Sequence, residues 1–258
     1  MSTTIPAIAW NELHTPDRPK AEAFYNALFG WTSTPVEMSP EYTYHLLNHP
    51  DGGMFAGSHQ QGPDEAESPS FWLVSLTTND VDGVTARAAE LGATIIMEPM
   101  DIPGTGRFSM FIDPQGAAVS TLAYSDDGTP PNIGEGPGKI VWHELVTGDP
   151  DASTAFYTSI FDFTSEVSDM GELKATVFKQ GDTMFADVLP KPSPDIPDAW
   201  VLYVEVADAE ATIDLAVKSG GSVIAPAMPL PSIGIVAWLA DPTGAVFCIL
   251  QPEEPAAQ

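Results

Sequence analysis

The stretch that decides the fold is residues 10–17, WNELHTPD, because it returns 132 residues later as residues 142–149, WHELVTGD. Nine of the 22 positions in residues 10–31 are identical to those in residues 142–163, well above chance. The turn-like sequence at residues 113–116, DPQG, returns as DPTG at residues 241–244. A chain that repeats itself over this length contains two similar domains in tandem.

The boundary between the repeats lies at residues 125–139, SDDGTPPNIGEGPGK, which contain seven Pro or Gly and almost no large apolar residue. That composition is typical of a linker. We therefore predict a first domain at residues 1–124 and a second at residues 140–258. Polar stretches near residues 61–70 and 189–198 divide each domain into two halves.

Each half shows the same order of elements. A short apolar strand leads to an Asp where a helix N-cap belongs, and the helix that follows carries its apolar residues on one face. Three further strand candidates come after the helix. The unit is therefore βαβββ, with four copies in the chain. The four predicted caps are Asp17, Asp80, Asp149 and Asp208.

The charge balance is strongly acidic, with 36 Asp and Glu against 9 Lys and Arg and a net charge of −27. Such a surface repels phosphate backbones, so nucleic acid and anionic membranes are not expected as partners. The acidic surplus has two interpretations. Either it steers a cationic ligand towards a binding site, or it is only a solvated acidic surface without a specific function.

Salt should stabilise this protein. Repulsion between the surplus carboxylates weakens when ions screen it, so the melting temperature should rise from low to molar salt. Thermal unfolding followed by circular dichroism across a salt series measures this. A melting temperature that stays flat or falls would contradict the prediction.

Other compositional features are consistent with a cytoplasmic protein. No apolar run reaches the length of a transmembrane helix, and residues 1–9 do not resemble a signal peptide. Cys248 is the single cysteine, which excludes an internal disulfide. With 43% hydrophobic residues, the chain has enough apolar material for a packed core.

The pattern resembles the vicinal oxygen chelate superfamily, also called the glyoxalase/bleomycin-resistance/dioxygenase fold. The marks are a first strand leading to Asp-x₆-Phe-Tyr at Asp17 and Asp149, and Asp-Pro-x-Gly before the last strand of each repeat. The tandem arrangement is most similar to a two-domain subgroup of antigen-like and hydroxylase-like proteins. The resemblance implies an α+β fold in which four βαβββ units form two tandem domains with incomplete barrels.

The resemblance also implies where a metal would be held, because metal-dependent relatives place ligands on the first and last strands of each half. None of the mapped first-strand and last-strand positions carries the His, Glu or Gln of those relatives, and at the remaining position, near residues 54–57 and 185–187, only Asp187 could bind a metal. The usual ligand set is therefore missing and no metal is predicted. The mapped positions are Trp10, Leu73 and Ser120 in the first repeat and Trp142, Val201 and Cys248 in the second.

Glu12 and Glu144 are the candidate catalytic residues. Each lies two residues beyond the mapped first-strand position and so faces the same interior. Each is either a structural glutamate satisfied by N–H donors, or a general base or cation-binding carboxylate with a raised pKa. His14, His45, His49 and His59 are either alternative metal ligands or plain surface and strand-end histidines. His14 shares the face of Glu12, and a strand histidine such as His45 could converge on it, but Val146 replaces His14 in the second repeat.

Further ligand-binding candidates follow from strand alternation. The aromatic ones, Trp10 and Trp142, are either plain core or stacking walls for a flat ligand, as in bleomycin-resistance-type relatives. Arg107 is either a surface arginine or a group that recognises an anion. The remaining candidates are Leu73, Ser75 and Ser120 in the first repeat and Val201, Tyr203, Glu205 and Cys248 in the second.

Three functions remain open. The first, which we favour, is binding of a small organic molecule in an aromatic-walled pocket, without the usual metal site and without a cofactor. The second is an enzyme of the hydroxylase, dioxygenase, isomerase or lyase type, using Glu12 or Glu144 as a base or an atypical Fe, Zn, Ni or Mn site. The third is a structural or interaction protein with filled pockets. Four units in one chain predict a monomer with an internal pseudo-dimer, or a homodimer.

Overall fold

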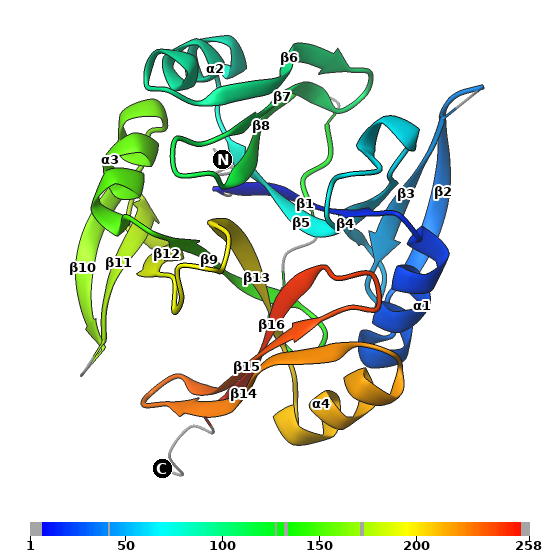
Figure 1. Cartoon of the computed structure of the whole chain (residues 1–258). Coiled ribbons are helices and arrows are strands. Elements are labelled where there is room, and N and C mark those ends of the chain that lie inside the picture. Colours follow the sequence, from blue (N-terminus) through cyan, green and yellow to red (C-terminus); the bar gives the residue numbers. More distant parts are fainter. Residues whose placement is uncertain (1–6, 41, 127, 132–133, 171–172, 254–258) are drawn as a thin grey trace. The chain divides into compact units, whose positions relative to one another are not determined.

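The computed structural model describes residues 7–253 apart from 41, 127, 132–133 and 171–172. The first repeat begins with β1 and contributes two helices, one 3₁₀ turn and eight strands (Figure 1). Its elements are β1 (Ile8–Thr15), α1 (Arg18–Phe29), β2 (Thr32–Ser39), β3 (Tyr42–Asn48), β4 (Met54–Gln60), η1 (Pro63–Glu65), β5 (Phe71–Thr77), α2 (Val81–Glu90), β6 (Thr94–Ile102), β7 (Gly106–Ile112) and β8 (Ala118–Tyr124).

The second repeat has the same order of helices and strands. Its elements are β9 (Ile140–Thr147), α3 (Pro150–Ile160), β10 (Thr164–Met170), β11 (Leu173–Gln180), β12 (Thr183–Pro190), β13 (Ala199–Glu205), α4 (Ala209–Lys218), β14 (Ser222–Leu230), β15 (Gly234–Ala240) and β16 (Val246–Pro252). Each repeat forms one eight-stranded sheet, in the orders β2-β3-β4-β1-β5-β8-β7-β6 and β10-β11-β12-β9-β13-β16-β15-β14. The predicted α+β fold of four βαβββ units is therefore confirmed.

The helix starts are those that the sequence predicts. The carboxylates of Asp17, Asp80, Asp149 and Asp208 each accept a hydrogen bond from the backbone N–H three residues later. Each bond satisfies one of the free amides at a helix N-terminus. Helix α1 ends at Gly30, whose φ of 69° lies in the left-handed region that glycine adopts without a steric penalty.

The chain forms two compact units, and each unit combines parts of both repeats. Unit 1 comprises residues 1–11, 73–130 and 143–201, and unit 2 comprises residues 12–72, 131–142 and 202–258. Helix α2 contacts α3 in unit 1, and α1 contacts α4 in unit 2 (Figure 1). Each core accordingly contains apolar side chains from both repeats, such as Phe111 and Phe178 in unit 1 and Phe24 and Phe247 in unit 2.

The repeated Phe-Tyr and Asp-Pro-x-Gly sequences bind each other inside unit 1. One carboxylate oxygen of Asp113 accepts hydrogen bonds from the backbone N–H groups of Gln115, Gly116 and Ala117 at 2.8–2.9 Å. The other accepts from the hydroxyl of Tyr157 at 2.9 Å, and that hydroxyl accepts from the indole N–H of Trp200, also at 2.9 Å. These three side chains are almost fully buried. The aspartate of one repeat therefore holds the tyrosine of the other.

Unit 2 contains the corresponding three residues, but here the tyrosine and the tryptophan come from the first repeat and the aspartate comes from the second. The indole N–H of Trp72 donates to the hydroxyl of Tyr25 at 2.9 Å. Burial and then the nearby carboxylate of Asp241 raise the pKa of Tyr25 well above its ordinary value, so the hydroxyl keeps its proton. The family-like motifs read in the sequence thus stabilise contacts between repeats.

The last part of the predicted linker is attached to unit 2. The backbone N–H of Gly138 donates to the carbonyl of Glu205 at 2.8 Å, and the indole of Trp31 donates to the carbonyl of Gly138 at 2.8 Å. The ammonium of Lys139 pairs with Asp51 at 2.8 Å. Among the residues that the structure describes, no helix has both the length and the apolar character needed to cross a membrane.

Candidate functional site

A polar group of side chains gathers at the end of β1 in unit 2. Strand β1 runs parallel to β4, and this pairing places His14 directly beside His59 and Glu12 beside Gly57. The ring of His14 stacks on Phe71, with 4.7 Å between the ring centroids, and lies 4.9 Å from the ring of His59. Because the strands fix both backbones, the two imidazoles are held together by the fold itself.

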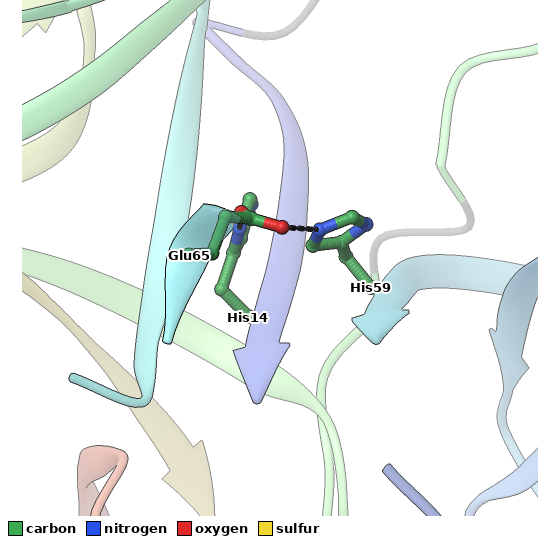
Figure 2. A group of neighbouring side chains, drawn as sticks. All are labelled: His14, His59 and Glu65. Atoms are coloured by element: carbon green, nitrogen blue, oxygen red, sulfur yellow. Dashed lines mark hydrogen bonds and ion pairs between the residues drawn. The ribbon is translucent and has the colours of Figure 1, made fainter. Parts of the chain in front are cut away.

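Two glutamates complete this group. Nε2 of His14 lies 2.8 Å from Oε1 of Glu12, and Nε2 of His59 lies 2.8 Å from Oε2 of Glu65. Nδ1 of His14 is 4.0 Å from Oε1 of Glu65. Figure 2 shows the carboxylate of Glu65 between the two rings. We call His14, His59 and Glu65 the histidine–glutamate group.

Glu12 is an ionised carboxylate with two partners. The hydroxyl of Tyr44 donates to its Oε2, and His14 contacts its Oε1. Burial raises the pKa of Glu12, but His14, Tyr44 and the charge of His59 together lower the pKa below its usual value. The raised pKa that accompanied the functional interpretation of Glu12 is therefore not found. A carboxylate of lowered pKa is a weak proton acceptor, so the geometry favours charge binding over general-base catalysis at Glu12.

Gly57 makes room for the Tyr44–Glu12 contact. A Cβ atom at this position would lie 1.8 Å from the hydroxyl oxygen of Tyr44. The paired position in the second repeat carries Asp187, which lies beside Glu144. Val146 and Leu189 pair there where His14 and His59 pair in the first repeat. The histidine–glutamate group therefore has no counterpart at these positions, as the sequence indicated for His14.

The structure brings some predicted residues together and separates others. Ser75 and Ser120 share a hydrogen bond of 2.5 Å, and Tyr203 is paired in register with Cys248. Leu73, Val201 and Cys248 are almost completely buried, whereas Trp10 and Trp142 are half-buried. The large aromatic clusters, around Trp31 in unit 2 and Tyr157 in unit 1, belong to the cores.

Arg107 and Glu205 make contacts outside the polar group. The guanidinium of Arg107 pairs with Asp82 at 2.6 Å and with Asp101 at 2.8 Å. The carboxylate of Glu205 accepts from the backbone N–H of Gly136 at 3.0 Å, so it secures the predicted linker. These partners are consistent with the plain interpretation of Arg107 as a surface arginine.

Of the strand histidines that could converge on His14, His59 does so and His45 does not. Nδ1 of His45 lies 3.2 Å from Glu22 instead. His14 is reached by His59 and Glu65. His59 is one of the alternative histidine ligands that the sequence offers, whereas Glu65 is not singled out by the sequence. The signal for His59 is topological, since the last strand of a βαβββ unit lies parallel to its first. Nothing in the spacing of Glu65 indicates its position.

A sequence model of the Glyoxalase/Bleomycin resistance protein/Dioxygenase superfamily matches residues 7–121 and 139–249. The chain belongs to this superfamily. Each matched segment begins just before the first strand of a repeat and ends within its last strand, so the superfamily assignment covers the two repeats separately. The predicted resemblance is confirmed.

Two superfamily relatives match nearly the whole chain. "Putative glyoxylase CFP32" of Mycobacterium tuberculosis is 34% identical over 248 residues, which cover 94% of each protein. The anthracycline biosynthesis protein DnrV of Streptomyces peucetius is 32% identical over 272 residues, covering 97% of this chain and 96% of that protein. Both alignments therefore span the two repeats of this chain.

Solved structures confirm the fold. The Mn(II)-bound glyoxalase of Novosphingobium aromaticivorans aligns with a TM-score of 0.61 and 15% identity over 96% of this chain and 82% of that one. The 2,3-dioxygenase LapB of Pseudomonas sp. KL28 aligns with a TM-score of 0.61 and 11% identity, and the alignment covers 100% of this chain and 97% of that one. At these identities the comparison shows a common architecture and leaves the chemistry to the site residues.

Proposed function

We propose that the first repeat binds a small organic molecule that carries a positive charge, with Glu12 as the residue that receives the charge. The observation that supports this most directly is the ionised, partly exposed carboxylate of Glu12 at the end of β1. A carboxylate accepts about four hydrogen bonds, so the contacts with Tyr44 and His14 leave capacity for a ligand.

The overall charge supports the same ligand class. A net charge of −27 attracts cations and raises their concentration near the protein. The relative named for anthracycline biosynthesis suggests a flat aromatic molecule as the first to test. An anthracycline that carries an amino sugar has both the flat ring system and the ammonium group.

A second candidate function is proton transfer by His14. Its Nε2 lies 2.8 Å from the Glu12 carboxylate. A carboxylate in this position fixes the orientation and tautomer of an imidazole, as in many acid–base sites. In this alternative His14 transfers the proton and Glu12 only positions the imidazole. This role of Glu12 differs from the general-base role that the sequence analysis considered for it.

The test is a fluorescence titration of the protein with an anthracycline and with its aglycone, which lacks the ammonium. We expect tighter binding of the amino-sugar form by wild type and loss of that preference, about tenfold, in Glu12→Gln. Glu37→Gln removes the same charge from an exposed position of β2 and is the matched control. Equal affinities of wild type and Glu12→Gln for both molecules, or no binding of either, would overturn the proposal.

A further inference from the structure

The histidine–glutamate group is assembled by three different backbone elements. His14 lies at the end of β1, His59 at the end of β4, and Glu65 in η1 (Figure 2). Glu65 is held in place by a hydrogen bond of 3.0 Å from the backbone N–H of Gly62 to its Oε2. Strand pairing and this turn contact fix all three residues independently of any contact among their side chains.

Each imidazole already has one ring nitrogen committed to an outer partner. Glu12 lies 2.8 Å from Nε2 of His14, and the hydroxyl of Tyr42 lies 3.0 Å from Nδ1 of His59. The remaining nitrogens, Nδ1 of His14 and Nε2 of His59, both face the carboxylate of Glu65. When the ring protons lie on the outer nitrogens, Nδ1 of His14 and Nε2 of His59 each offer a lone pair within 4.0 Å of a carboxylate oxygen of Glu65.

We infer that His14, His59 and Glu65 form a binding site for a divalent transition-metal ion. Two imidazole nitrogens and one carboxylate oxygen suit zinc, iron, nickel or manganese, and three protein ligands leave coordination positions open for water or a ligand. Glu12 and Tyr42 then act as positioning residues that set the tautomer and orientation of each ring, which is the usual arrangement around metal-bound histidines.

The distances fit such an ion after small side-chain movements. Ligands with bonds of about 2.1 Å lie roughly 3.0–3.4 Å from one another. The ligand atoms of the histidine–glutamate group lie within 4.8 Å of one another. Nε2 of His14 is buried and lies 2.8 Å from Oε1 of Glu12, so Nδ1 is the ring nitrogen left to bind the ion. The carboxylates of Glu12 and Glu65 supply the negative charge that balances a divalent cation.

This site lies apart from the superfamily positions considered above. The mapped first-strand position in this repeat is Trp10, four residues before His14. The second repeat has Val146 and Leu189 in place of the two histidines. The inference therefore assigns one metal ion per chain, in the first repeat, and it goes beyond the proposed organic ligand without depending on it.

The experiment is a titration of chelator-treated protein with Zn²⁺ alone, followed by calorimetry, and with Co²⁺, followed by its visible absorption. Salt at about 0.2 M is added to screen the non-specific attraction of the metal ions to the acidic surface. Wild type should bind one ion. His59→Ala and Glu65→Gln should each weaken binding at least 100-fold, and Tyr42→Phe should weaken it about tenfold through the lost orienting contact.

His45→Asn is the matched control, because His45 also faces a glutamate in unit 2 but lies outside the group. It should bind as wild type does. Circular dichroism establishes that each variant is folded, and His59→Gln replaces His59→Ala if the latter is not. Absence of binding by wild type at millimolar metal, or equal affinity in wild type, His59→Ala and Glu65→Gln, would overturn the inference. Because no organic ligand is present, this outcome leaves the proposed function untouched.

Discussion

Asp113→Ala should destabilise the protein by on the order of 4 kcal/mol at neutral pH, because one substitution removes the acceptor of four donors, two of them buried and two partly buried. Three of these donors are the backbone N–H groups of the turn that starts at Asp113, and the fourth is the hydroxyl of Tyr157. The buried donors, the Ala117 amide and the Tyr157 hydroxyl, would be left without an acceptor beside a side chain only 3% exposed. Chemical denaturation of wild type and variant measures the difference in the free energy of unfolding.

Two further variants separate the contributions. Asp113→Asn keeps an acceptor oxygen for the three amides and removes a charge whose burial raises the pKa of Asp113, so its cost should stay near 1 kcal/mol. Tyr157→Phe removes the contact between repeats and should cost about 1–2 kcal/mol. Asp162→Ala removes the same charge from an exposed position and should change stability little. A loss in Asp113→Ala no greater than in Asp162→Ala would contradict the prediction.

The sequence predicts the fold well because its signals are local and occur four times. An aspartate before each helix satisfies a backbone amide wherever the helix packs, and the strand alternation is legible without tertiary information. The role of Tyr157 is different. Its hydroxyl donates to Asp113, which lies 44 residues earlier in the chain and in the other repeat. The presence of a tyrosine in the Phe-Tyr motif is therefore explained only by the packing of the two repeats against each other.

The candidate site is predicted only in part, for a related reason. Alternation along a single strand places Glu12 and His14 on one face, and the structure joins them at 2.8 Å. His59 requires knowledge that β4 is parallel to β1 and in which register. Glu65 depends on the shape of a 3₁₀ turn of three residues, which carries no periodic signal.

The pKa of Glu12 shows a further limit of sequence reasoning. Burial alone predicts a raised value, and burial is its largest single influence in the structure. Three neighbours reverse the direction, and two of them, Tyr44 and His59, arrive from other strands. The sign of a pKa shift therefore follows from the partners that the fold supplies, which a burial pattern does not contain.

A second large effect should appear in acid, where His143 makes folding depend on pH. His143 is buried in unit 1, and its Nε2 lies 2.8 Å from Oδ1 of Asn11, its counterpart in the first repeat. Burial lowers the pKa of His143 to about 3, whereas the unfolded chain has the ordinary value of about 6.5. Between these values only the unfolded chain takes up the proton.

Stability should therefore fall as the pH falls from 6.5 towards 3, by up to about 1.4 kcal/mol per pH unit from this residue. Denaturation of wild type and His143→Gln between pH 7 and pH 4.5 isolates the effect, because both proteins share every other titrating group. Wild type should lose about 2–3 kcal/mol more than the variant over this range. Asn11→Ala removes the hydrogen bond and leaves the buried imidazole, so it should lower stability at every pH and keep the wild-type slope. If the free energy of unfolding of wild type and of His143→Gln fell in parallel with pH, the folded protein would take up the proton on His143 as readily as the unfolded chain does. That result would contradict the prediction.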